Sequence, residues 1–325
     1  MGEIENVYIR IVLKTIKMFR ILFSLLFVSL SFAQQTDKVD FIKCDASVSP
    51  NASEKSINGD VIYEFKVKKT IDTIKIDAKY MEFSRVMING KSVKFKNSGK
   101  TLDLFEGFKK GKNKLTFSYS AQPKQTLYFT GEGENLQIWT QGQGKYTSYW
   151  LPSFDDVNEK VIFNITISDI NPYLKIISNG LFKNNTDVMY MDYDAFKMQK
   201  PMSSYLVMLA IGNFEKQTAT SKSGTSLEFY LDRNDVSKFE PTYRNSKELF
   251  DYLEQEIGVK YPWGIYRQVP VRDFLYAGME NTTSTVFSQD FVVDEIGFND
   301  RNYVNVNAHE LAHQWFGDLV TAKES

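Results

Sequence analysis

Short stretches of alternating apolar and polar residues run up to about residue 230, and they constrain the fold more than any other feature. Leu115, Phe117 and Tyr119 alternate in this way, and so does the stretch 161–167. A period of two places apolar side chains on one face of a half-buried strand. Many such strands separated by turns predict an antiparallel saddle-like sheet or sandwich.

Particular turns and strands can be placed within this β-rich part. Asn89 and Gly90 lie between two extended stretches, and an Asn-Gly pair supplies the positive φ angles of a two-residue hairpin turn. A second such pair, Asn179 and Gly180, follows further along the chain. The apolar run at 205–211 predicts a buried strand.

The hydrophobic period becomes helical near residue 232. Leu249, Leu253 and Ile257 follow helical spacing, and Gly258 is placed as a C-terminal cap. An extended piece is expected at 268–271. The change of period predicts a second domain.

Length and composition agree with two ordered domains, because 42% of the 325 residues are hydrophobic and can form a sizeable core. We predict an N-terminal β-domain at 34–232 and the start of an α+β domain at 233–325. A net charge of −1 favours no nucleic-acid partner. Cys44 is the sole cysteine, which excludes an intrachain disulfide and predicts a packed thiol.

The only two histidines of the chain, His309 and His313, flank Glu310 in an H-E-x-x-H motif. Positions four apart on a helix share a face and are separated by roughly 6 Å along its axis, so both imidazoles can bind one Zn²⁺ ion. Glu310 projects near the same face and can act as a general base on a water molecule. The motif therefore predicts a zinc-dependent peptide hydrolase.

The sequence around this motif predicts an amphipathic helix. Its apolar face, opposite the motif, is expected to pack into a core. That face comprises Leu311, Ala312, Trp315 and Leu319. Asp300 and Asn302 are predicted to cap the start of the helix.

A signal peptide is predicted at residues 1–33, because basic residues precede the apolar stretch 21–32 and Ala33 offers a small residue for cleavage before Gln34. Met18 opens a more compact signal, so residues 1–17 are interpreted as the product of an upstream start. We expect export to the periplasm or the extracellular space and no membrane span in the mature chain. An uncleaved anchor is the alternative.

A second motif, Ala277-Gly278-Met279-Glu280-Asn281, precedes the histidines. Alone it could be an ordinary turn. Together with H-E-x-x-H it closely resembles the aminopeptidase N family of zinc metallopeptidases, which combine a G-x-M-E-N loop with that motif. Ala277 stands where the family commonly has glycine.

A third match extends this resemblance over most of residues 40–325. Thr140-Gln141-Gly142-Gln143 and the following stretch 151–155 are similar to the family's T-Q-x-E/Q segment and Pro-x-x-Asp element. The family resemblance implies a thermolysin-like catalytic domain.

The resemblance also implies roles for individual residues. Gln143 and Glu280 would bind the free α-amino group of a peptide substrate, and the backbone of Gly278 and Met279 would hold its main chain. Such an end wall would restrict cleavage to the first peptide bond.

The same resemblance implies a third zinc ligand, a glutamate, beyond Ser325. Asp318 and Glu324 are not expected to replace it, because Asp318 would point away on a continued helix and Glu324 would lie too far along it. We therefore interpret the chain as the N-terminal portion of a longer enzyme. With two protein ligands, the 325-residue chain itself is expected to bind zinc weakly and to be inactive or nearly so.

The predicted function is that of a zinc aminopeptidase acting on peptides with a free N-terminus. Two alternatives stay open at this point. One is a zinc endopeptidase that uses the same helix, and the other is a non-catalytic exported binding protein with a vestigial half zinc site. The preferred first residue and the oligomeric state are open as well.

Overall fold

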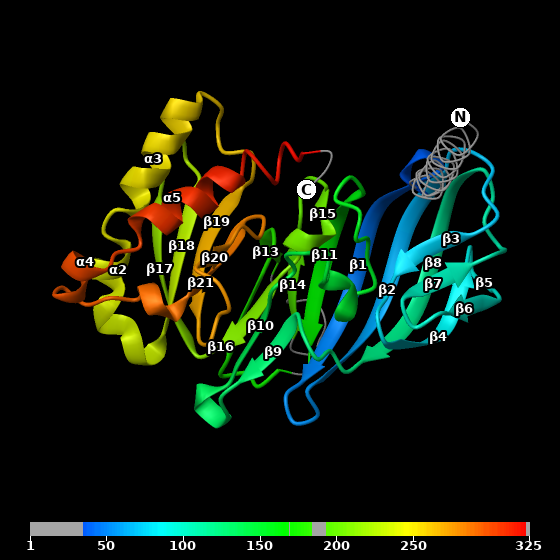
Figure 1. Ribbon diagram of the computed structural model, residues 1–325, viewed down its shortest axis with the longest axis horizontal. Helices are drawn as coiled ribbons and strands as arrows, with labels where there is room; N and C mark the ends of the chain where they lie inside the picture. The colour runs from blue at the N-terminus through cyan, green and yellow to red at the C-terminus, as the bar shows by residue number, and fades with distance from the viewer. Residues whose placement is uncertain (1–34, 169, 184–192, 323–325) are drawn as a thin grey trace, which may run out of the picture. The chain divides into compact units, whose positions relative to one another are not determined.

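A computed structural model describes residues 35–168, 170–183 and 193–322 (Figure 1). The predicted signal peptide and Glu324 lie outside these residues. Internal contacts divide the chain between Asp37 and Lys38. Of the first unit only the 3-10 turn η1 (Gln35–Asp37) is described, and all that follows concerns the second unit.

The largest sheet contains nine strands among the described residues, in the order β13-β14-β11-β1-β2-β8-β4-β5, with β15 paired to β11. Its strands are β1 (Val39–Asn51), β2 (Ser56–Val67), β4 (Met81–Ile88), β5 (Lys91–Ser92), β8 (Gly111–Ala121), β11 (Lys160–Ser168), β13 (Leu181–Lys183), β14 (Tyr193–Lys197) and β15 (Met202–Ser203). Neighbours pair antiparallel except β1 and β11, which run parallel. The β-rich prediction is thus confirmed, with one parallel pair inside the sheet.

Two smaller antiparallel sheets complete the β-rich part, in the orders β12-β16-β10-β9 and β3-β7-β6. Their strands are β12 (Lys175–Ser178), β16 (Leu209–Gly212), β10 (Gln137–Thr140), β9 (Leu127–Thr130), β3 (Ile74–Asp77), β7 (Thr101–Leu104) and β6 (Phe95–Asn97). Short 3-10 turns connect them, namely η2 (Gly133–Asn135), η3 (Thr147–Tyr149) and η4 (Ser204–Leu206).

The alternating stretches bury one face of their strands, as predicted. Leu115, Phe117 and Tyr119 of β8 are all buried, and β11 alternates between buried and half-buried positions along its length. Cys44 is a buried free thiol, in agreement with the sequence. Apolar burial of this kind is the main source of stability for such a sheet.

The two Asn-Gly turns differ. Asn89 (φ 53°) and Gly90 (φ 79°) connect the paired strands β4 and β5, so the hairpin is confirmed. Asn179 and Gly180 instead lead from β12, in the small sheet, to β13, in the large one. This turn therefore passes the chain from one sheet to another.

The prediction of one strand over 205–211 is wrong for its first half. The segment is largely buried, but a 3-10 turn comes first and β16 begins only at Leu209. The side chain of Asn179 accepts a hydrogen bond from the Met208 backbone N–H at 2.7 Å. A side chain thus takes the place of a neighbouring strand there.

The fourth sheet, which lies last in the chain, has the order β17-β18-β19-β21-β20 among the described residues, with β18, β19 and β21 parallel. Its strands are β17 (Phe214–Thr220), β18 (Ser226–Asp232), β19 (Ile265–Val271), β20 (Gly278–Met279) and β21 (Ser284–Ser288). The extended piece predicted at 268–271 lies in β19. The predicted domain boundary at 232 falls at the end of β18, within this sheet, and its exact position stays a prediction.

The helices of the described chain lie beside this fourth sheet (Figure 1). They are α2 (Phe239–Tyr243), α3 (Ser246–Ile257), α4 (Gly297–Asp300) and α5 (Val304–His313), with the 3-10 turns η5 (Arg233–Lys238) and η6 (Gln289–Phe291). α3 and α5 lie in contact, and Phe250 of α3 packs against Tyr266 of β19 and Trp315 just after α5. No helix in the described ranges is long and apolar enough to cross a membrane.

The helix that carries the histidines differs in detail from the prediction. Asn302 does accept a hydrogen bond from the Val304 backbone N–H at 3.2 Å, but Asp300 is the last residue of α4 and does not cap α5. α5 ends at His313, so Leu319 lies beyond it and is 36% exposed. Leu311 and Trp315 are buried as expected.

Candidate metal and peptide site

The two histidines face each other at the C-terminal end of α5. Their Nε2 atoms lie 3.1 Å apart, and the ring planes are nearly perpendicular at 86°. Two ligands of a tetrahedral zinc ion, with Zn–N bonds of about 2.0–2.1 Å, are separated by roughly 3.4 Å. The two Nε2 atoms can therefore occupy two corners of a tetrahedral zinc site if the distance between them increases slightly.

The other nitrogen of His313 favours the same use of the ring. Its Nδ1 atom lies 3.1 Å from the Phe316 carbonyl oxygen. A proton on Nδ1 donates to this carbonyl and leaves the Nε2 lone pair free for a metal. Histidines that bind metals commonly donate their other ring N–H to a backbone carbonyl in this way.

Glu310 is pressed against strand β20. It is 6% exposed, and a Cβ atom at Gly278 would lie only 2.5 Å from its Oε1 atom. Burial, followed by the charge of Glu280, raises the pKa of Glu310 to about 8. The helix and the second motif thus meet at Gly278, where an added Cβ would displace the Glu310 side chain.

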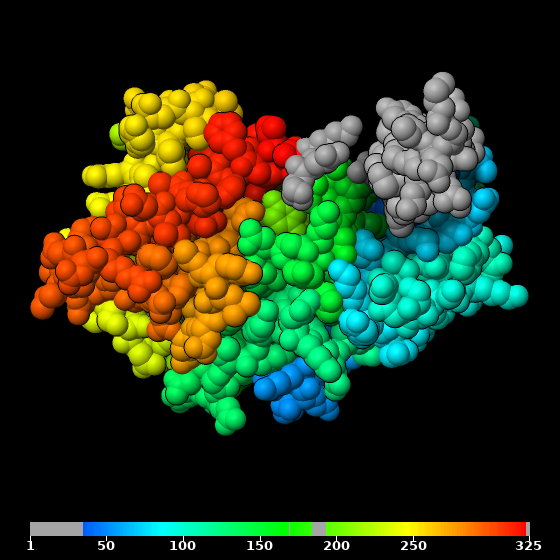
Figure 2. All heavy atoms as spheres, in the orientation of Figure 1, coloured from blue at the N-terminus to red at the C-terminus, as the bar shows by residue number. Residues whose placement is uncertain are grey.

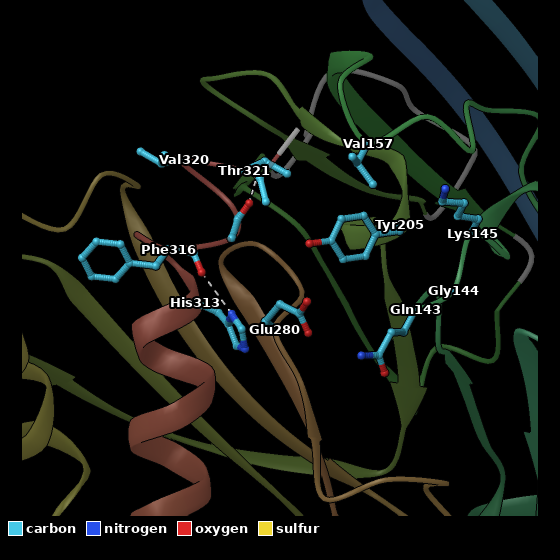
Figure 3. A pocket seen from close by; sticks show the side chains of 12 residues that line it. Gln143, Gly144, Lys145, Val157, Tyr205, Glu280, His313, Phe316, Val320 and Thr321 are labelled. Carbon is cyan, nitrogen blue, oxygen red and sulfur yellow. Dashed lines mark hydrogen bonds between the residues drawn. The ribbon is translucent and has the colours of Figure 1, made fainter. Parts of the chain in front are cut away.

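A cavity of about 680 Å³ lies beside His313 (Figure 3), and its volume is in the usual range for ligand pockets. Gln143 from the loop after β10, Glu280 from the loop after β20 and His313 from α5 all line it. Three residues that the sequence predicts for the site therefore share one cavity. Figure 2 shows α5 and the following turn, in red, beside green atoms of the β-rich part.

The other predicted residues take different places. Among the cavity's lining residues, His309, Glu310, Gly278 and Met279 do not appear. Met279 is buried, and its sulfur lies 3.9 Å from the side-chain nitrogen of Gln141. The Met279 side chain thus packs in the interior against Gln141 and not in the cavity, while its backbone belongs to β20.

Tyr205 is a lining residue that the sequence reasoning missed. Its side chain projects into the cavity near Glu280 in Figure 3. Burial and then the charge of Glu280 raise the pKa of the Tyr205 hydroxyl above its ordinary value. A Cβ atom on Gly142 would lie 2.3 Å from the Tyr205 carbonyl oxygen, so this glycine lets the Gln143 loop approach. No periodic pattern marks Tyr205 in the sequence.

Asp318 lies elsewhere than the sequence predicted. The expectation that it points away assumed that the helix continues, whereas the chain turns back after α5 and the Asp318 N–H donates to the His313 carbonyl at 3.0 Å. Its carboxyl group is fully buried, and this burial, with the charges of Glu280 and Glu310, raises its pKa. Within the described ranges, no group of three or more His, Cys, Asp or Glu side chains is arranged to hold a metal.

Comparisons with known proteins agree with this arrangement. The family model described as Peptidase M1 N-terminal domain matches residues 42–206, and the one described as Peptidase family M1 domain matches residues 242–324. The matched regions contain the Gln143 loop in the first case and both the 277–281 and the 309–313 motifs in the second.

Curated relatives are similar over most of the chain. "Probable aminopeptidase 1" of Sulfurisphaera tokodaii is 26% identical over 80% of this chain and 33% of its own length. "Aminopeptidase N" of Lactobacillus helveticus is 28% identical over 86% of this chain and 34% of its own length. "Glutamyl aminopeptidase" of Sus scrofa is 29% identical over 53% of this chain and 19% of its own length. The chain spans between 19% and 34% of the length of these relatives. Since the N-terminal family model alone covers half of the sequence, the chain belongs to the M1 peptidase family.

Proposed function

We propose that the protein is the N-terminal part of a zinc-dependent aminopeptidase, which releases the first residue of peptides. The observation that carries this proposal is the paired Nε2 atoms of His309 and His313, 3.1 Å apart, beside a cavity that Glu280 also lines. A two-histidine metal site beside an acidic wall suits hydrolysis of a substrate that carries a terminal amine. The aminopeptidase names of the relatives support the same activity.

The metal-binding residues in this proposal are His309 and His313, with a third ligand from residues that follow Ser325 in the longer protein. The relatives, of which this chain matches 33% and 34%, leave room for such a residue. Bound zinc supplies Lewis acidity and lowers the pKa of water. Residues 1–325 alone are expected to bind zinc weakly, because two protein ligands make an incomplete site.

Glu310 is the proposed general base. Its carboxylate takes a proton from the attacking water and passes it to the nitrogen of the leaving amine. The close packing of Glu310 on Gly278 restricts the positions that the carboxylate can take before the substrate arrives. This preorganisation lowers the cost of aligning the reacting groups.

The substrate is proposed to enter along β20. This strand pairs only with β21 among the described strands, so it forms an edge of the sheet that can bind an extended peptide backbone. Glu280 then accepts hydrogen bonds from the substrate ammonium group, and Gln143 adds a side-chain oxygen. A charged acceptor makes the stronger of these bonds.

Export is part of the proposal as well. The basic residues, apolar stretch and small residues of the first 33 positions are typical of a signal peptide, so we expect the protein in the periplasm or outside the cell. Sequencing the N-terminus of the protein recovered from these compartments tests this: a start at Gln34 supports cleavage, and a start at Met1 or Met18 contradicts it.

The activity is tested on the full-length natural protein that contains this sequence. We expect it to hydrolyse aminoacyl-fluorophores, to leave their N-acetylated forms intact, and to lose activity with a zinc chelator. Equal hydrolysis of blocked substrates would contradict the amine anchor, and cleavage of internal bonds would favour the endopeptidase. Full activity of Glu310→Gln would contradict the proposed base.

A further inference from the structure

Gln314, the residue after His313, is fully buried and uses its whole side-chain amide. Its Oε1 atom accepts hydrogen bonds from the Thr283 backbone N–H at 2.9 Å and the Tyr261 hydroxyl at 3.0 Å. Its Nε2 atom donates to the carbonyl oxygens of Glu280 at 3.1 Å and Asn281 at 3.4 Å. One side chain thus connects the end of α5 by hydrogen bonds to residues 280–283, which we call the Glu280 segment.

The same segment is held from its other side by the turn between β12 and β13. The Asn179 side chain donates to the Thr282 carbonyl at 2.6 Å, and the Gly180 N–H donates to the Thr283 hydroxyl at 2.7 Å. Thr283 has a φ angle of 68°, in the left-handed region that a β-branched residue rarely adopts. Such a conformation persists only where the surroundings impose it.

We propose that Gln314 is a positioning residue that sets the distance between the Glu280 carboxylate and the metal-binding His313. It is covalently adjacent to His313 and hydrogen-bonded to the carbonyl of Glu280 itself, so it joins the two by the shortest route. This inference rests on the proposed function, in which Glu280 binds the amine and His313 the zinc.

The consequence concerns ligands that engage both points at once. A ligand with an amine and a metal-binding group gains affinity from its second contact only when the spacing of the two sites matches its own. Misplacement by about 1 Å is enough to cost a factor of roughly a hundred in well-aligned systems. Loosening the Glu280 segment should therefore weaken the amine contact and leave the metal contact intact.

The test measures binding by calorimetry to the zinc-loaded full-length protein. Its probes are leucine hydroxamate and 4-methylpentanohydroxamic acid, which lacks only the amine. In the wild-type protein we expect the amine to raise affinity at least about tenfold, as a charge-assisted contact does. In Gln314→Met we expect this ratio to fall by about tenfold, with unchanged affinity for the amine-free compound and unchanged zinc content.

Two further variants separate positioning from general damage to the fold. Gln268→Met removes another buried glutamine, which donates to Asn307 of α5 at 2.7 Å but does not reach the Glu280 segment, so the ratio should stay at its wild-type value. Gln314→Glu keeps an acceptor for Thr283 and Tyr261 but loses the donor to the Glu280 carbonyl. It should lower the ratio even where the methionine variant fails to fold.

The outcomes are distinguishable. A wild-type ratio retained in Gln314→Met and in Gln314→Glu overturns the inference and leaves the proposed function standing. The inference is also overturned if Gln268→Met lowers the ratio as much as Gln314→Met. Equal affinity of the wild-type protein for both compounds overturns the amine anchor, and the inference with it.

Discussion

At the scale of single residues, the space available at Gly278 is limited by the side chain of Glu310 opposite it. Its backbone needs no left-handed φ, yet an added Cβ would lie 2.5 Å from the Oε1 and 2.7 Å from the Cγ of Glu310. In this chain the absence of a side chain at Gly278 therefore leaves room for the proposed base. Side chains held this closely leave little freedom to relax.

We predict that Gly278→Ala displaces the Glu310 carboxylate and lowers kcat by about 10- to 100-fold, while the protein stays folded. The measurement is steady-state kinetics of the full-length protein, with its melting temperature as a check. Gly264→Ala is the matched control, because a Cβ there meets its nearest atom at 3.4 Å, an ordinary contact. Unchanged kcat in Gly278→Ala would show that the close packing has no role in catalysis.

A second prediction concerns Glu159, which is buried and accepts a hydrogen bond from the Phe41 N–H at 2.8 Å. Burial, with a contribution from Asp40, raises the pKa of Glu159 to about 7. Between about pH 4.5 and 7 the unfolded chain therefore loses this proton before the folded one, so stability falls as pH rises through this window and then levels off.

Glu159→Gln keeps the acceptor and removes the titration. We expect its free energy of unfolding to rise relative to the wild type between pH 4.5 and 7.5, by on the order of 1–3 kcal/mol. Chemical denaturation at both pH values measures this. The control is Glu64→Gln on the exposed side of β2. A difference that does not change with pH would contradict the raised pKa.

At the scale of elements, α3 is ended by its capping residue. Gly258 adopts a φ of 70°, and its N–H donates to the Glu254 carbonyl at 3.2 Å. Since α3 lies against α5, the end of this helix also supports the element that carries the histidines. Glycine at this position avoids the steric cost that a Cβ brings in the left-handed region.

We expect Gly258→Ala to lower the free energy of unfolding by about 1 kcal/mol, and Gly258→Asn to cost less, because asparagine tolerates left-handed backbone better. Urea denaturation of the three proteins gives the order. Gln255→Ala, at an exposed position of the same helix, should change stability by less than about 0.5 kcal/mol. Equal stability of the alanine and glycine forms would contradict the capping role.

At the scale of the whole described molecule, Arg267 joins the two sheets on which the site depends. It is 2% exposed, and its Nε donates to Glu228 at 2.7 Å. Its Nη1 atom donates to the carbonyls of Ser178 at 3.1 Å and Gly180 at 2.7 Å, across to the turn after β12. This turn also donates hydrogen bonds to the Glu280 segment. Arg267 therefore stabilises, through the turn, the segment that contributes Glu280 to the cavity.

We predict that Arg267→Met destabilises the protein by about 3–5 kcal/mol, because it leaves the Glu228 carboxylate without its principal partner and frees two buried carbonyls. Thermal and chemical unfolding measure the loss. The double variant Arg267→Met/Glu228→Gln should recover part of it, since no buried carboxylate then lacks its arginine. Lys216, the other ionic partner of Glu228 at 2.9 Å, is 39% exposed and stays hydrated. A double variant less stable than the single one would contradict this account.

The sequence by itself determined the class of protein and much of the local structure. Spacing alone was enough to predict the histidine pair, the cap at Gly258, the hairpin at Asn89 and the buried faces of β8 and β11, because each depends on neighbours within a few residues. The family resemblance added the residues Gln143 and Glu280, and the cavity contains both.

Only the tertiary structure decided how these parts meet. The end of α5 at His313, the turn that buries Asp318, the place of Tyr205 in the cavity and the four hydrogen bonds of Gln314 all depend on segments remote in sequence. No local sequence pattern predicts them, because a hydrogen bond between segments remote in sequence does not produce a periodic arrangement of residues. The physical reason is that packing and buried hydrogen bonds are satisfied by whatever the fold brings near, not by what precedes them in the chain.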